Sequence, residues 1–157
     1  MRNTLKLATS IIVCFLAGGV GTIFTNGSLY TWYPHLIKPF FSPPNSVFGP
    51  VWTILYLLMG VSFYLIWKKG TKNKKVREAM MFFGIQLGIN AIWTPIFFGA
   101  HNTLLALIVI LLLWVFILKT ILLFSKINKI ASYLLYPYIL WVSFATILNF
   151  SLYLLNK

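Results

Sequence analysis

The residues of this 157-residue chain best suited to chemistry are indole and carboxamide side chains placed inside apolar stretches. Trp52, Trp93 and Trp141 each lie within a long apolar segment, and Gln86 and Asn90 precede Trp93 by about two turns and one turn. At about 100° per residue, Gln86, Asn90 and Trp93 share one helical face. A carboxamide in lipid is costly unless it faces protein or a cavity, so this face should point inward.

Two further stripes supply aromatic partners for that face. Phe48, Trp52 and Tyr56 recur at every fourth position of one segment. The last apolar segment presents a third stripe, formed by Tyr138, Trp141, Ala145, Leu148 and Asn149. Together the three stripes predict an aromatic cavity with a few amide groups, which suits a flat, apolar ligand with a polar handle. The alternative is that these rings only pack the core.

The composition excludes several other kinds of chemistry. Glu78 is the only acid, so paired-carboxylate catalysis is excluded. Cys14 is alone and cannot form a disulfide within the chain. His35 and His101 have no ligand partners at metal-binding spacing, so we expect no metal site and no required cofactor. Hydrolysis and ATP use are also not expected, because no nucleophile elbow or phosphate-binding loop is present.

The apolar content points to a membrane protein. Hydrophobic residues make up 60% of the chain and charged residues 9%, against about 45–50% and 25% in soluble domains. Five stretches reach the roughly 20 residues needed to cross a bilayer, and they cover residues 5–25, 47–67, 79–99, 103–124 and 130–155. The predicted fold is therefore all-α, a single integral membrane bundle of five transmembrane helices over residues 1–157.

The basic residues predict the orientation of this bundle. Of the 13 Lys and Arg, 11 fall in the N-terminal segment and the loops near 68–78 and 119–130, and two, Lys38 and Lys157, fall on the opposite side. This bias predicts a multi-pass protein of the cell membrane with its N-terminus in the cytoplasm and its C-terminus outside. The net charge of +12 is then explained by topology and by affinity for anionic membrane lipid, and no nucleic acid partner is expected. A cleaved signal peptide is the alternative for the first span, but its apolar stretch continues past Gly19 to Phe24.

Two more features concern access and assembly. Residues 32–44, WYPHLIKPFFSPP, contain four prolines and predict a stiff extracellular lid. Lys38 in this segment is expected to meet either a ligand carboxylate or water and headgroups. Gly84 and Gly88 form a GxxxG pair turned away from the Gln86 face, which predicts a homodimer interface. Tight packing within one bundle is the alternative for these glycines.

The chain resembles the translocator protein family, also called tryptophan-rich sensory protein or peripheral benzodiazepine receptor, in its bacterial type. The resemblance covers about residues 19–155. It rests on four segments in order, which are WY–L–KP–F–PP over 32–44, FGPVWTILYLLMG over 48–60, Q–N–W–FFG over 86–99 and PY–W–FATILN over 137–149.

This resemblance implies a receptor or carrier that binds porphyrins such as protoporphyrin IX and haem, and benzodiazepine-site ligands. It implies a pocket beneath the lid, between the first, second and fifth spans. The ligand contacts carried over by position are Tyr33, Phe48, Trp52, Asn90, Trp93, Trp141, Ala145 and Leu148. It also implies that porphyrin is either a ligand or a substrate of light-dependent breakdown, in which Trp52 and Trp141 take part. The alternative function is a lipid or sterol transporter, although the sterol pattern at Leu148, Tyr153 and Lys157 is loose.

Overall fold

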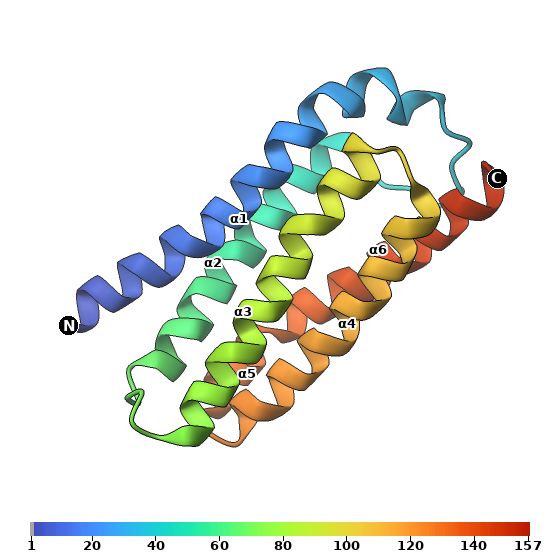
Figure 1. Cartoon of the computed structure of the whole chain (residues 1–157). Helices are drawn as coiled ribbons and strands as arrows, with labels where there is room; N and C mark the ends of the chain where they lie inside the picture. Colours follow the sequence, from blue (N-terminus) through green and yellow to red (C-terminus); the bar gives the residue numbers. More distant parts are fainter. Residues whose placement is uncertain (1) are drawn as a thin grey trace.

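The structure, a computed structural model, describes residues 2–157 and consists of helices joined by short connections (Figure 1). The long helices are α1 (Asn3–Thr31), α2 (Phe48–Trp67), α3 (Lys74–Thr94), α4 (Thr103–Ser125) and α6 (Tyr136–Leu155). Shorter pieces are η1 (Tyr33–His35), η2 (Asn45–Val47), the π-helical η3 (Pro95–Gly99) and α5 (Lys129–Leu134). Joined across their short pieces, these helices form five segments long and apolar enough to cross a membrane, which confirms the all-α, five-helix prediction.

Helices α3, α4 and α5 begin where asparagine side chains cap free backbone amides. Asn73 Oδ1 accepts from the Lys75 amide at 2.9 Å, and Asn102 Oδ1 accepts from the Leu105 amide at 2.9 Å. Asn128 Oδ1 accepts from two amides at the start of α5. Each bond satisfies a donor that has no partner within its own helix. Three of the connections therefore end at positions marked by asparagine in the sequence.

The last predicted span differs from a single continuous helix. It is divided at Leu135 into α5 and α6, with Pro137 in the first turn of α6. Proline has no amide hydrogen and its ring collides with the carbonyl four residues earlier, so a helix ends ahead of it. Pro95 has a related effect, because the regular helix α3 stops at Thr94 and a π-helical turn follows.

The first and third spans are also longer than expected. Helix α1 continues from Thr25 to Thr31, and α3 begins at Lys74, five residues ahead of Ala79. The added turns carry polar side chains, so a prediction based on apolar content alone does not include them in the spans. They extend α1 up to the lid and α3 into the basic loop.

The two ends of the bundle have different character. The N-terminus lies at the same end as the connections α2–α3 and α4–α5, whereas the C-terminus and the segment between α1 and α2 lie at the other end (Figure 1). The first end therefore collects most of the Lys and Arg residues. This arrangement agrees with the charge bias, while the side of the membrane that each end faces remains a prediction.

The half of the bundle near the basic end holds a large buried apolar cluster. A buried cluster there includes Met59, Ile66, Phe83 and Phe124, all contributed by different turns of α2, α3 and α4. Helix α1 lies against α2 and α3 and leaves most of its side chains exposed. The opposite half holds a second, aromatic cluster around Tyr33 and Phe97. Between these clusters the helices enclose the cavity described next.

Candidate functional site

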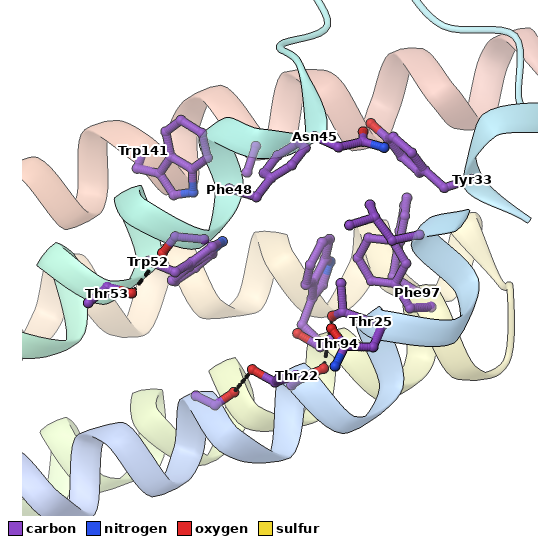
Figure 2. A pocket seen from close by; sticks show the side chains of 18 of the residues that line it. Thr22, Thr25, Tyr33, Asn45, Phe48, Trp52, Thr53, Thr94, Phe97 and Trp141 are labelled. Carbon is purple, nitrogen blue, oxygen red and sulfur yellow. Dashed lines mark hydrogen bonds between the residues drawn. The ribbon is translucent and has the colours of Figure 1, made fainter. Parts of the chain in front are cut away.

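A cavity of about 530 Å³ lies between α1, α2, α3 with η3, and α6, beneath the lid. One side is aromatic, and Figure 2 shows Trp141 of α6 near Phe48 and Trp52 of α2 there. The opposite side is formed by hydroxyl-bearing residues, including Thr22 and Thr25 of α1. The cavity is thus apolar on one face and mildly polar on the other, as expected for an amphiphilic ligand.

Seven of the eight residues predicted as ligand contacts line this cavity. They are Tyr33, Phe48, Trp52, Trp93, Trp141, Ala145 and Leu148. The residues come from the lid, α2, α3 and α6, and helix packing brings them together. No ligand is present, so their role in binding remains a prediction.

Asn90 does not line the cavity and instead lies one layer below it. It is 4% exposed, accepts a hydrogen bond from the Tyr56 hydroxyl at 2.6 Å and donates to Tyr138 Oη at 2.8 Å. The Tyr138 hydroxyl in turn donates to Gln86 Oε1 at 2.7 Å. The Gln86–Asn90 face points inward as predicted, but it is used to connect three helices. Direct contact of Asn90 with a ligand is therefore not favoured by this geometry.

Tyr56 is the residue that transmits this network to the cavity. Its ring lines the cavity floor and stacks on Trp52, with ring centres 5.6 Å apart and an interplanar angle of 29°. The sequence placed Tyr56 in the Phe48–Trp52 stripe, yet it was not counted among the ligand contacts. Gly18 of α1 makes room for it, because a Cβ there would lie 2.6 Å from the Tyr56 ring.

Trp93 is held by its indole N–H. Nε1 donates to Asn149 Oδ1 at 3.1 Å, and the Asn149 amide donates to the Thr103 carbonyl at 2.9 Å. The Trp93 ring stacks on Phe97, with centres 5.0 Å apart. These contacts fix one aromatic wall of the cavity and join α3, α4 and α6 at its edge.

The polar wall on α1 is the part that sequence reasoning missed. The Thr22 hydroxyl donates to the Gly18 carbonyl at 3.1 Å, and the Thr25 hydroxyl donates to the Gly21 carbonyl at 2.8 Å. Internal bonds of this kind let threonines lie in apolar surroundings without an unpaired donor. The repeated Gly-x-x-x-Thr spacing was the available signal, and it recurs at Gly49 and Thr53 of α2.

The lid is fastened at its first residue and near its middle. At the C-terminal end of α6, the Asn156 side chain accepts from the Ile37 amide at 2.8 Å and donates to the Ile37 carbonyl at 2.9 Å. Near the end of α1, Trp32 stacks on His101 with centres 4.2 Å apart. The prolines thus act together with two tertiary contacts to hold the segment over the cavity.

Tyr33 is the lid residue that enters the cavity. It is 2% exposed, and its hydroxyl has no hydrogen-bond partner. Burial raises the pKa of this phenol, and the nearby Ser42 hydroxyl opposes the shift. The Lys38 ammonium lies 4.7 Å from the centre of the Tyr33 ring. Lys38 does not line the cavity, and its ammonium donates to the Leu36 carbonyl within the lid at 3.4 Å.

The predicted dimer glycines are on an open surface. A Cβ built at Gly84 or Gly88 would meet no atom within 4 Å, so no other helix of this bundle packs closely against them. The alternative of tight packing inside one bundle is therefore not favoured. Whether a second copy covers this face remains a prediction.

Five helices long and apolar enough to cross a membrane, four of which border an aromatic cavity beneath the lid, define a multi-pass membrane protein with an internal cavity. Residues 10–154 match the model of the TspO/MBR family, and the chain belongs to this family. It is 44% identical to the tryptophan-rich protein TspO of Archaeoglobus fulgidus, over 98% of this chain and 99% of that protein. It is 41% identical to the human translocator protein, over 83% and 78% of the two chains. It is 35% identical to the tryptophan-rich sensory protein of Cereibacter sphaeroides, over 94% and 92%.

Proposed function

We propose that this protein is a membrane receptor or carrier that binds porphyrins, such as protoporphyrin IX and haem, in the cavity beneath the lid. One observation carries the proposal, namely that Trp52, Trp93 and Trp141, from three separate helices, all line one cavity. Flat aromatic walls favour stacking with a flat conjugated ring system. The same walls would accept synthetic benzodiazepine-site ligands, which are also flat and mostly apolar.

The two-sided character of the cavity supports an oriented ligand. The ring system of a porphyrin is apolar, whereas its propionate groups are polar and require donors or water. Tyr33 lines the cavity, and its hydroxyl, which has no hydrogen-bond partner among residues 2–157, is available as a donor. The Thr22 and Thr25 hydroxyls already donate to carbonyls of α1, so they offer acceptor oxygens that can hold a bridging water. Binding of this kind requires no energy source and no cofactor.

A binding experiment tests this proposal directly. Purified protein is titrated with protoporphyrin IX in the dark while tryptophan fluorescence is recorded. We expect saturable quenching that is weakened at least several-fold by Trp93→Ala. The control is Trp67→Phe, because Trp67 lies at the basic end of α2 and does not line the cavity. Absence of quenching at micromolar pigment would contradict porphyrin binding.

Light-dependent breakdown of the bound porphyrin is the second candidate. It is favoured by the position of Trp52 and Trp141, whose rings border the space that the pigment would occupy. The pigment, light and dioxygen would supply the chemistry, and the indole rings would exchange electrons with the excited pigment. Illumination should bleach the porphyrin absorbance, and Trp52→Phe or Trp141→Phe should slow bleaching while binding is retained. Equal bleaching rates in all three proteins would leave binding as the function.

Lipid or sterol transport is the alternative function. Flux of a labelled lipid or sterol through protein-containing liposomes, unaffected by added porphyrin, would favour it over pigment handling. We further propose that the protein forms a homodimer through the Gly84–Gly88 face of α3, since this face is open in the single chain.

A further inference from the structure

A second hollow lies on the outer surface of the bundle, at the seam between α2 and α6. We call it the seam groove. It is lined by Val51, Ile54 and Leu55 of α2 together with Pro137, Leu140, Trp141 and Phe144 of α6. Trp141 is also part of the wall of the inner cavity. One indole ring therefore borders both spaces.

The seam exists because the neighbouring helices pair differently. Helix α2 packs against α1 and the short α5, whereas α6 packs against α4. The break at Leu135 separates α5 from α6, so the two parts of the last span serve different neighbours. Contact across the seam is made by side chains. Among them, the rings of Phe48 and Trp141 meet edge-to-face with centres 6.0 Å apart.

The chemistry of the seam groove selects an apolar occupant. Every wall residue is apolar, and the rim residues Ile54 and Leu140 are 58% and 70% exposed. Both helices are long and apolar enough to span a membrane. Val51 and Leu55 follow the first residue of α2 by three and seven positions, or roughly 5–10 Å at 1.5 Å per residue. Both positions therefore fall inside the segment Asn45–Trp67 that is apolar enough to cross a membrane, where the neighbouring molecules would be lipid acyl chains.

Trp141 is held in place differently from Trp93 and Trp114, whose indole N–H groups are hydrogen-bonded. The indole N–H groups of Trp93 and Trp114 donate to Asn149 and Ser143. The Trp141 Nε1 is buried and has no hydrogen-bond partner. Its position depends on packing against rings such as Phe48 and Phe144. Because only packing holds the Trp141 ring, a molecule that enters or leaves the seam groove or the inner cavity can shift it.

We propose that the seam groove binds an acyl chain of a membrane phospholipid, and that the Trp141 indole is the partition between this chain and the inner cavity. At Trp141 the inner cavity therefore borders the lipid directly, at a place away from the lid. Neither the acyl-chain site nor the partition requires that the cavity binds porphyrin.

The acyl-chain site is tested with a phosphatidylcholine that carries a diazirine in the middle of one chain. The protein is reconstituted in vesicles containing this lipid, irradiated and mapped by mass spectrometry. Labelling of Leu140 and Phe144 should exceed several-fold that of Leu111, which is 50% exposed on α4 and lines neither hollow.

Filling the groove provides the matched comparison. Ile54→Trp should lower labelling of Leu140 to the level at Leu111, whereas Leu111→Trp should leave Leu140 unchanged. Equal labelling of Leu140 and Leu111 in the natural sequence would overturn the acyl-chain site.

The partition is tested by removing the ring. Trp141→Ala should raise diazirine labelling of Leu148, a buried residue of the inner cavity wall, several-fold. Trp141→Phe keeps an aromatic ring at this position and should leave labelling of Leu148 low. Unchanged labelling of Leu148 in a Trp141→Ala protein with native helical circular dichroism would overturn the partition.

A second measurement uses only Trp→Phe substitutions, which keep an aromatic ring at each position. Lipids brominated along their acyl chains quench nearby tryptophan fluorescence. The difference in emission between the natural sequence and Trp141→Phe reports Trp141 alone, and we expect this component to be quenched at least twofold more than that of Trp93, obtained with Trp93→Phe. Equal quenching of the two components would contradict the placement of Trp141 beside an acyl chain.

Discussion

The Tyr56 hydroxyl on α2 donates a 2.6 Å hydrogen bond to Asn90 Oδ1 on α3, directly below the cavity. Asn90 passes the connection to Tyr138 on α6, and Tyr138 passes it to Gln86. Three helices are therefore joined by one buried chain of side-chain hydrogen bonds. The position of the cavity floor depends on it, because Tyr56 is both a member of the chain and part of the floor.

Asn90→Leu should destabilise the bundle by about 1–2 kcal/mol, since the Tyr56 hydroxyl loses its buried acceptor. The measurement is reversible unfolding in mixed detergent, followed by circular dichroism. Ser151→Ala is the control, because the Ser151 hydroxyl bonds only to the Ile147 carbonyl of its own helix. An Asn90→Leu protein as stable as the control would show that the network contributes little.

Gly60→Ala should also be destabilising, by about 1–3 kcal/mol. A Cβ at this position would lie 2.7 Å from the Ile11 Cα, so α1 and α2 would have to separate. Gly27→Ala is the matched control, since a Cβ there meets nothing within 4 Å. The control should be neutral or slightly more stable, because alanine favours helix over glycine by up to about 1 kcal/mol. Equal melting temperatures of the two variants would contradict the close approach of α1 and α2.

The proposed dimer predicts that Gly84→Leu together with Gly88→Leu yields monomers. A leucine on this face prevents the close backbone approach that a GxxxG pair allows. Light scattering coupled to size-exclusion chromatography measures the mass of the protein in detergent. Gly27→Leu, on an open part of α1, should leave the mass unchanged. A dimer that persists in the double variant would place the interface elsewhere.

The buried Tyr33 phenol predicts a loss of stability at alkaline pH. Burial raises its pKa in the folded protein above the usual value of 10.0. The folded state therefore holds this proton more tightly than the unfolded state does, and stability falls as the pH rises above about 10. Tyr33→Phe removes the group, and its unfolding free energy should decline less between pH 9 and 11 than that of the natural sequence. Parallel declines would show that Tyr33 does not couple folding to pH.

The hydrogen bonds between Asn156 and the lid predict that their loss makes the lid backbone more mobile. Asn156→Ala removes both bonds to the Ile37 backbone and frees the lid from the C-terminal end of α6. Hydrogen exchange of residues 34–40 should become faster while exchange in α3 is unchanged. Asn128→Ala, which alters a cap at the opposite end of the bundle, is the control. Unchanged exchange in the lid would indicate that the prolines alone hold it.

Several features of this protein follow from local properties of the chain. Apolar runs of about 20 residues form spanning helices regardless of which helices surround them. Consecutive spans run in opposite directions, so alternate connections lie at the same end of the bundle, and these are the connections that carry most of the Lys and Arg residues. The inward direction of Gln86 and Asn90 follows from helical periodicity and from the cost of an amide in hydrocarbon. The family could likewise be predicted, because its motifs are short segments in fixed order.

Other features arise only when the helices meet. The Asn90 side chain is hydrogen-bonded to the hydroxyls of Tyr56 and Tyr138, which come from two other helices, and it does not line the cavity. No pattern within α3 predicts these partners. Trp141 borders two hollows because α2 packs against α1 and α5 while α6 packs against α4, which leaves a seam between α2 and α6. Periodicity determines which face of a helix turns inward, whereas the partner that meets each side chain on that face is decided by helix packing.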